Sequence, residues 1–367
     1  VPKLARLLTR QCRNDQEKAL VLYTWIASHI HYDHYAAAHD EARPDQSGQA
    51  TLRRGSAVCE GYSRLFVSLA QECGLNAVKL SGYVKSWDKV VVDDDDRHAW
   101  NAAYWDNRWH LLDCTWGAGD IKSGTYPPEY FDVPPEQMLA SHFPDDPAWQ
   151  LRLRAPMTRY QFDHQCVRQP AFFALGMELA DTWLVQVNIE KQGLIHLRVP
   201  EDVFVEAHLY QGQRPISWGG LLISRRGDLI ALGIRPPRPG RYRLHVYASR
   251  SDLPSSPAVL TYYLNCSQGW DVWPAYPRFQ PAFQEEGVQL HQPLQGSLKQ
   301  GKHHFKLSAP GARSVSVLSG GKSFQLARDD DSFEGDVVVA GGGARVLAKY
   351  GLLSFGPDSL LYFKTAP

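Results

Sequence analysis

The sequence predicts an α+β domain followed by two all-β sandwich domains. In the first part, two runs carry apolar residues at helical spacing, and short alternating runs follow them. Past residue 165 the helical spacing gives way to repeated alternating segments such as WLVQVNI, VFVEAHLY and YRLHVYAS. Turn-rich sequence such as RPPRPGRY separates these segments, and many short strands between turns are typical of a β-sandwich.

Four segments are expected along the chain. The α+β domain takes 1–168, a first β-sandwich module 169–268, a linker rich in proline and aromatic residues 269–285, and a second β-sandwich module 286–367. The linker is proposed because WPAYPRFQPAF interrupts the alternation. The last module rests on runs such as HHFKLSA, SVSVLSG and LLYFKTA.

Two helices are predicted in the first domain. The run DQEKALVLYTWIASHI predicts a helix over 15–31, with Asp15 as its capping residue. A second helix follows Cys59 directly, because apolar residues again recur at intervals of three and four, and Gly74 is a natural stop.

A hairpin is predicted from HAWNAAYW and RWHLLDCTW, with Asp106 and Asn107 as a two-residue turn. This turn pairs Trp105 with Arg108, so paired positions sum to about 213. Period-two alternation then places His98 and Asp113 on one face as diagonal neighbours. Cys114 is expected to face the other way and to pack in the interior.

Composition excludes several classes of function. The 367 residues include 39 basic and 39 acidic residues, so the net charge provides no electrostatic attraction to nucleic acid or to an anionic membrane. No apolar run approaches the roughly 20 residues of a membrane span, and VPKLARLLTR is too polar for a signal peptide. We therefore expect a soluble chain. The first residue is not Met, which leaves a removed targeting segment and the compartment open.

No cofactor or metal is expected. The six cysteines form no CxxC pair, which argues against a zinc cluster and a disulfide-stapled scaffold. The acidic run at 93–96 lacks the glycine turn and distal glutamate of a calcium loop, so we interpret it as a solvated loop. Four clustered histidines match no metal motif and are expected at a helix end or lining a groove: His29, His31, His34 and His39.

Cys59 lies between a small-residue loop and a helix, in RRGSAVCEGYSRLFVSLAQECGL. A helix start stabilises a thiolate through its unpaired N–H groups and the macrodipole. Gly55, Ser56 and Gly61 are expected to let a substrate backbone approach. A lone cysteine is more often a buried packing residue, so the thiol alone does not indicate catalysis.

His98 and Asp113 complete the chemistry that a thiol nucleophile needs. An imidazole takes the proton of the thiol, and a carboxylate fixes the tautomer of the imidazole and stabilises its cation. The predicted hairpin brings these two residues together. Cys59, His98 and Asp113 are therefore the candidate catalytic residues.

Several motifs resemble the transglutaminase-like cysteine protease superfamily, in particular its kyphoscoliosis peptidase branch. They are VCEGYSRLF, LSGYVKS, RHAWNAAYW, RWHLLDCTWGAG and HFPDDPAWQL, and the resemblance runs from about residue 15 to residue 175. It implies a papain/transglutaminase-like α+β catalytic domain with Cys59 as nucleophile, His98 as base and Asp113 as orienting acid. It also implies that the later β modules are immunoglobulin-like.

The oxyanion hole departs from the papain-like pattern. That pattern places a glutamine six residues before the cysteine, where this chain has Arg53. The backbone N–H of Cys59 can supply one donor. Gln49 is our first candidate for the second donor, with Gln46 and Trp25 as alternatives.

These features indicate a thiol acyl-transfer enzyme that acts on protein or peptide amides, as a peptidase or amide hydrolase. If an amine resolves the thioester in place of water, the protein is a crosslinking transglutaminase. A third reading is a catalytically silent scaffold that binds protein partners through its β modules.

Overall fold

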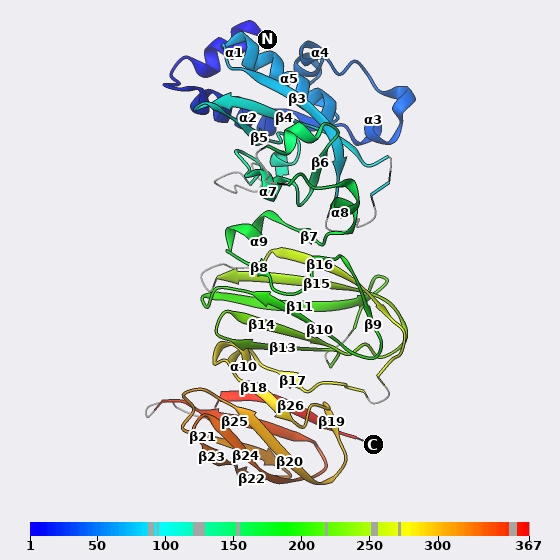
Figure 1. The fold of residues 1–367 in the computed structure, drawn as a ribbon, viewed down its shortest axis with the longest axis vertical. Coiled ribbons are helices and arrows are strands. Elements are labelled where there is room, and N and C mark those ends of the chain that lie inside the picture. Colours follow the sequence, from blue (N-terminus) through cyan, green and yellow to red (C-terminus); the bar gives the residue numbers. More distant parts are fainter. Residues whose placement is uncertain are drawn as a thin grey trace. The chain divides into compact units, whose positions relative to one another are not determined.

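The computed structural model forms two compact units, Val1–Gln165 and Cys166–Pro367 (Figure 1). It describes residues 1–86, 92–93, 95–119, 129–151, 155–216, 219–250, 256–270, 273–351 and 358–366. Among the helices within these ranges, none has the length and apolar character needed to cross a membrane.

The first unit is helical at its start and carries a sheet further on. Its helices are α1 (Pro2–Thr9), α2 (Asp15–His29), α3 (His34–Ala38), α4 (Gly48–Arg54), α5 (Cys59–Glu72), α7 (Pro135–Met138) and α8 (Arg159–His164), with 3₁₀ turns η1 (Asp40–Ala42) and η2 (Pro147–Gln150). Both predicted helices are present. The cap of α2 is Asn14 instead of Asp15: its Oδ1 accepts from the Glu17 N–H at 2.8 Å. The helix also ends two residues early, because Ile30 is extended.

The sheet of the first unit is antiparallel, in the order β5-β4-β3-β6. Its strands are β3 (Ala77–Val84), β4 (Arg97–Trp105), β5 (Arg108–Leu112) and β6 (His142–Pro144), and a short parallel pair joins β1 (His31–Tyr32) to β2 (Ser56–Ala57). The predicted hairpin register is confirmed, because Trp105 pairs with Arg108. Asp106 and Asn107 have φ of 48° and 59°, as a two-residue type I′ turn requires.

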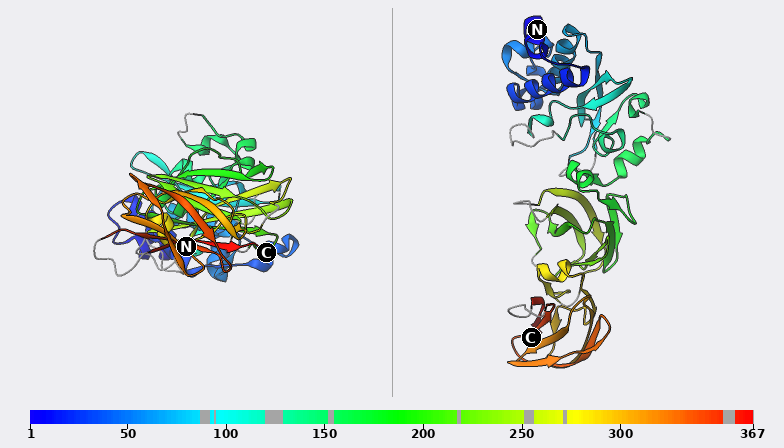
Figure 2. Two further views of the ribbon diagram at one scale, coloured as in Figure 1. Left: turned by 90° about the horizontal axis from the view of Figure 1, so that it is seen from below. Right: turned by 90° about the vertical axis from the view of Figure 1, so that its left-hand side faces the viewer.

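Two apolar layers cover the sheet. On one face α1, α2 and α5 form a large core, which includes Leu22, Phe66, Trp105 and Cys114. In the right-hand view of Figure 2 these blue helices lie to one side of the cyan sheet. On the other face a smaller cluster surrounds Trp100. Cys114 is buried in the helix-side core, as predicted.

The second unit begins with a β-sandwich. One sheet has the order β13-β14-β10-β8, and the other β12-β11-β15-β16-β7, with β9 parallel to β16. The bounds are β7 (Val167–Arg168), β8 (Glu178–Leu179), β9 (Gln186–Ile189), β10 (Gly193–Arg198), β11 (Val203–Gln211), β12 (Arg214–Pro215), β13 (Leu221–Arg226), β14 (Leu229–Ile234), β15 (Gly240–Arg250) and β16 (Ala258–Cys266), with helix α9 (Pro170–Ala174). Tyr242 is buried, and its hydroxyl donates to the carbonyl of Arg238 at 2.8 Å, like the tyrosine corner of immunoglobulin-like sandwiches.

A second sandwich completes the unit. Its sheets run β17-β26-β25-β21-β22, with β19 beside β26, and β18-β20-β24-β23. The bounds are β17 (Arg278–Phe279), α10 (Pro281–Glu285), β18 (Gln289–Gln292), β19 (Ser297–Leu298), β20 (Gly301–Ser308), β21 (Ser314–Ser319), β22 (Lys322–Gln325), β23 (Ala327–Asp329), β24 (Ser332–Val339), β25 (Ala344–Lys349) and β26 (Asp358–Thr365). Phe305, Val317 and Phe333 lie in the core between the sheets.

The segment expected as a linker, 269–285, is partly folded. Tyr276 and Phe283 are buried in the core of the second sandwich. Gln284 lies against the first sandwich, where its side-chain amide exchanges two hydrogen bonds of 2.9 and 2.8 Å with the backbone of Val205. The aromatic content that suggested a linker thus serves packing, since large apolar rings are stabilised by burial.

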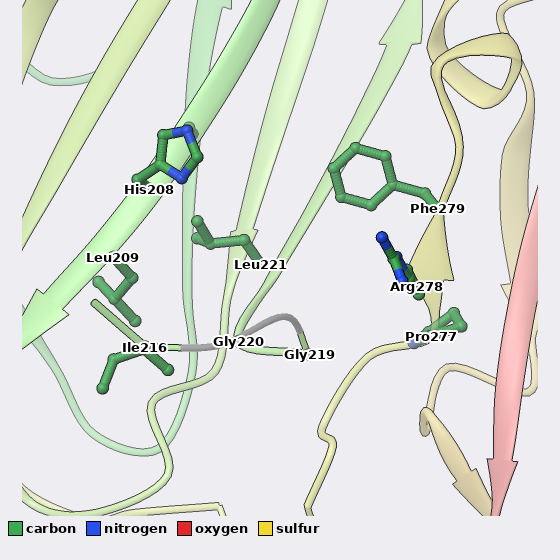
Figure 3. Close-up of a pocket in the computed structure, with 10 residues that line it drawn as sticks. His208, Leu209, Ile216, Gly219, Gly220, Leu221, Pro277, Arg278 and Phe279 are labelled. Carbon is green, nitrogen blue, oxygen red and sulfur yellow. The ribbon is translucent and has the colours of Figure 1, made fainter. Parts of the chain in front are cut away.

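A cavity of about 260 Å³ lies within the second unit, beside β11, β13 and β17 (Figure 3). Its lining residues are mostly apolar, with His208 and Arg278 as the ionisable side chains. Neither a cysteine nor a carboxylate lines this cavity among the described residues, so it does not carry the chemistry expected of the candidate residues.

Candidate active site

Cys59 is the first residue of α5, and its thiol is partly exposed. Val58 precedes it as the N-cap, and its side chain forms no cap hydrogen bond. The first-turn N–H groups of α5 therefore have no side-chain acceptor at the cap, which favours an anion beside them. The apolar face of α5 anchors this helix start to the core through Tyr62, Leu65, Phe66 and Leu69.

Close packing holds the turn that carries Cys59. A Cβ added at Gly61 would lie 2.4 Å from the Ala57 Cβ, 2.6 Å from the Thr51 Oγ1 and 2.7 Å from the Gln46 Oε1. Gly61 is therefore required for packing against the preceding segment, and the expectation that it opens a path for substrate is replaced by this role. Gly55 ends α4 at a φ of 70°, a conformation that glycine adopts without strain.

His98 and Asp113 are in contact, as the hairpin register predicts. His98 lies near the start of β4, and its Nε2 is 2.8 Å from the Asp113 Oδ2. The other oxygen of Asp113 accepts from the N–H groups of Thr115 at 2.7 Å and Trp116 at 3.3 Å. Both side chains are buried, and the carboxylate of Asp113 has no exposed surface. The carboxylate is thus fixed in place and oriented toward the imidazole.

The thiol of Cys59 is linked to the same pair. Burial alone would raise its pKa, but a hydrogen bond with His98 and the N–H of Ala99 lower the pKa below that of an ordinary thiol. Because the Nε2 of His98 is occupied by Asp113, Nδ1 is the nitrogen that remains for Cys59. The structure therefore brings Cys59, His98 and Asp113 together in one site, with His98 between the thiol and the carboxylate.

Electrostatic interactions between His98 and Asp113 favour the protonated, positively charged form of His98. Burial disfavours the charge on His98, but the neighbouring carboxylate outweighs it and raises the pKa of His98 to about 10. Burial likewise opposes the charge on Asp113, yet His98 and a second histidine hold its pKa well below the usual range. In contrast, burial raises the pKa of Cys114 far above that of a free thiol, so this neighbouring cysteine stays protonated.

The second histidine is His142, which sequence reasoning did not assign to the site. It lies at the start of β6, fully buried, with its Nε2 3.2 Å from the Asp113 Oδ2 and its Nδ1 2.8 Å from the Ser141 Oγ. The motif HFPDDPAWQL contained it without indicating a role. A three-residue strand has too little periodicity to predict which side chain faces the site.

The oxyanion candidates lie in different surroundings. Gln49, ranked first from the sequence, is exposed on α4. Gln46 is buried, and its Oε1 accepts from the Val58 N–H at 3.1 Å, directly before the nucleophile. Trp25 stacks on His29 and packs against the helical core. Among the described side-chain contacts of these three residues, Gln46 is the one that hydrogen-bonds to the segment directly before Cys59.

One group of side chains in the described part of the chain has metal-ligand character. The nitrogen atoms of His98 and His142 and an oxygen of Asp113 lie within 4.8 Å of one another. Their separations of 2.8 and 3.2 Å are hydrogen-bond lengths, and the carboxylate already accepts two backbone N–H groups. We therefore describe these residues as a hydrogen-bonded cluster.

The clustered histidines and the acidic run, neither of which was assigned to a metal from the sequence, have local contacts or lie partly outside the described residues. His29 and His39 contact the carbonyls of Trp25 and Tyr35, one helical turn earlier. In the acidic run, the N–H of Asp93 donates to the Asp96 carboxylate at 2.8 Å, and residue 94 lies outside the described residues.

Comparison with known protein families identifies the type of the first domain. Residues 2–114 match the transglutaminase-like superfamily. The N-terminal domain is therefore transglutaminase-like. Residues 159–277 match the KY-like, immunoglobulin-like domain, so a transglutaminase-like domain is followed by an immunoglobulin-like one.

Curated relatives share parts of this organisation. The chain is 31% identical over 273 residues to the kyphoscoliosis peptidase of Mus musculus, which covers 71% of this chain and 40% of that protein. It is 26% identical over 285 residues to hillarin of Drosophila melanogaster, which covers 67% of this chain and 34% of that protein. The chain thus spans less than half the length of these relatives.

Proposed function

We propose that this chain is a thiol-dependent acyl-transfer enzyme that hydrolyses amide bonds of proteins or peptides. The observation that carries the proposal is the buried contact of 2.8 Å between His98 and Asp113, with the thiol of Cys59 beside the same imidazole. A nucleophile, a base and a group that orients the base are the parts that covalent amide hydrolysis needs. The transglutaminase-like domain supports chemistry of the cysteine protease or transglutaminase type.

The proposed reaction begins with the proton of Cys59 held on His98. The sulfur attacks the amide carbonyl carbon, forming a C–S bond, and the C–N electrons leave with the amine while His98 returns its proton to that nitrogen. In the second half, His98 takes a proton from water as the water oxygen attacks the thioester. The C–S bond breaks, the acid is released, and the thiol with its imidazole partner is restored.

Two features support the role of Cys59 beyond its partners. The thiol is partly exposed, so a substrate carbonyl can reach it. The carbonyl oxygen of a bound substrate would gain negative charge next to the uncapped first turn of α5, where backbone N–H groups stabilise an anion. We therefore assign the Cys59 N–H as the first oxyanion donor.

The name of one matching relative, a kyphoscoliosis peptidase, favours hydrolysis over transamidation. That name belongs to the relative, and the acceptor used by this chain is open to a direct test. Incubating the enzyme with a peptide mixture and a biotinylated primary amine separates the two outcomes: hydrolysis yields new termini, and transamidation yields biotinylated peptides.

The proposal is tested at the thiol itself. Iodoacetamide at neutral pH should label Cys59 at least about ten times faster than Cys73, because a thiolate is the reactive form. Cys73 is a matched control, since it is also partly exposed and caps the other end of α5. Peptide cleavage should vanish in Cys59→Ala and persist in Cys73→Ala. Equal labelling of the two thiols, with no cleavage or amine transfer, would support a silent scaffold and contradict the proposal.

A further inference from the structure

Asp113 is held by two histidines from different strands, although the proposed chemistry uses one. Its Oδ2 is 2.8 Å from the Nε2 of His98 on β4 and 3.2 Å from the Nε2 of His142 on β6. The strand β6 lies at the edge of the sheet opposite to β5, after which Asp113 follows. The carboxylate therefore joins a histidine of the neighbouring strand β4 to a histidine of the far edge strand β6.

The contacts of His142 determine its tautomer. A carboxylate with a strongly lowered pKa carries no proton, so the nitrogen that faces it must supply the hydrogen. His142 thus donates through Nε2–H. Burial lowers the pKa of His142, so the ring is neutral and its Nδ1 accepts from the hydroxyl of Ser141 at 2.8 Å. Asp113 therefore sets this tautomer, and the hydroxyl of Ser141 satisfies the Nδ1 that is left as an acceptor.

The ring is also fixed by its neighbours. Trp100 and Trp116 lie 5.1 and 4.5 Å from it between ring centroids, and Tyr130 lies at 6.1 Å. Among the described residues, the titratable groups in contact with the ring are Asp113, His98 and Tyr130. An imidazole held by aromatic rings on its sides and by hydrogen bonds at both nitrogens has one available orientation.

A glycine on the intervening strand leaves room for this arrangement. In the register of the sheet, Gly82 on β3 pairs with His98 on one side and with Pro144 on the other. A Cβ at this position would lie 2.7 Å from the Cη2 of Trp100 and 2.0 Å from the carbonyl oxygen of Phe143. No side chain on β3 therefore separates the strands that carry the two histidines at this point.

We propose that His142 is a positioning residue: a neutral Nε2–H donor, held at its Nδ1 by the hydroxyl of Ser141, that holds the Oδ2 of Asp113 against His98. This inference rests on the proposed function, because it assigns His142 to the reaction of Cys59. The N–H dipole directs its positive end at the cluster, so it also stabilises the negative charge that appears when Cys59 ionises. His142 acts through Asp113 and does not contact the substrate.

The test is the pH dependence of iodoacetamide labelling at Cys59, which requires no turnover. In His142→Phe the ring shape is kept and the donor is lost, so the acid limb of the labelling profile should move up by about one pH unit. His142→Gln keeps an N–H donor at a similar reach and should restore the original profile. A residue with a purely structural role would give no such rescue.

Matched controls and a milder variant accompany this pair. His110 is a buried histidine that contacts Asp132 at 2.6 Å, away from Cys59, so His110→Phe should leave the profile unchanged. Ser141→Ala keeps the ring but removes the hydroxyl that holds its Nδ1, so the Nε2–H donor is less well fixed, and the acid limb should move in the same direction as in His142→Phe by a smaller amount. This variant gives an answer even where His142→Phe does not fold.

The outcomes separate the inference from the proposed function. If labelling of Cys59 is activated and depends on His142, but the protein cleaves no amide, the inference is supported and the proposed function is contradicted. If the unaltered chain, His142→Phe and Ser141→Ala all cleave peptides normally and share one labelling profile against pH, the inference is wrong and the proposed function is retained. An ordinary thiol profile in the unaltered chain overturns both.

Discussion

Replacing Asp113 by asparagine removes one buried charge and almost no volume. The side-chain oxygen of the new residue can still accept from the N–H groups of Thr115 and Trp116, so its NH₂ group occupies the place of Oδ2. This group would face the Nε2 of His98 at about 2.8 Å as a donor. His98 must then present an unprotonated Nε2 and carry its proton on Nδ1, toward Cys59. In that tautomer it cannot accept the proton of the thiol.

The size of the effect follows from the separation of the two charges. At an effective dielectric constant of about 20, unit charges about 4 Å apart interact by about 4 kcal/mol, or about three pKa units. The pKa of His98, about 10 in the unaltered chain, should therefore fall to near or below the ordinary value of histidine. Because the wrong tautomer also blocks proton transfer, kcat should fall on the order of a thousandfold or more.

The assay is an NMR titration of histidine-labelled protein, followed at the Cε1 of His98, together with peptide turnover. Asp132→Asn is the matched control, since Asp132 pairs with the buried His110 at 2.6 Å and lies outside the candidate site. The control should leave the titration of His98 and the turnover as they are. A His98 pKa that moves by less than one unit in Asp113→Asn would refute the claim that this carboxylate governs the imidazole.

Three further predictions concern folding and stability. A chain ending at Gln165 should keep a cooperative unfolding transition and a reactive Cys59, because the first unit has its own core; an unfolded product would contradict this. Asn107→Val should lower the free energy of unfolding by about 1–3 kcal/mol, since a β-branched residue is strained at a φ of 59°, while Asn107→Gly should not; equal unfolding midpoints in urea would rule this out. A Cys59→Ala background removes the opposing titration of the thiol. In this background the raised pKa of His98 stabilises the fold fully below about pH 6.5, and this stabilisation is lost as pH rises through the pKa of His98 in the folded state. The melting temperature should fall over that window, and His98→Gln in the same background should flatten the fall.

Local sequence rules predicted the contact between His98 and Asp113. A two-residue turn fixes strand register, and register fixes which side chains share a face, so both residues could be placed from Asp106 and Asn107 alone. Helical spacing likewise predicted the helix that starts at Cys59. The β-sandwich character of the second half followed from alternation between turns.

Features that depend on long-range packing were not predictable in this way. His142 reaches Asp113 from a strand 29 positions further along the chain, and no periodic signal indicates that meeting. Gln46 lies in the segment just before α4 and Gln49 lies within that helix, and which of them reaches the residues before Cys59 depends on how this part of the chain packs beside α5. The expected linker contains buried aromatic residues because the second sandwich supplies the partners for them.

Because the hairpin turns at Asp106 and Asn107, the effect of an insertion or deletion in its strands depends on whether the number of residues is odd or even. The turn lies at one end of the hairpin and the carboxylate that orients His98 follows the other end, so the number of residues between them determines which face each side chain takes. Removing one residue from β5 would bring the thiol of Cys114 to the position of the carboxylate and turn Asp113 toward the helical core. Removing two would restore the alternation while shortening the strand. This hairpin should therefore tolerate many substitutions, but it should tolerate insertions and deletions only when an even number of residues is added or removed.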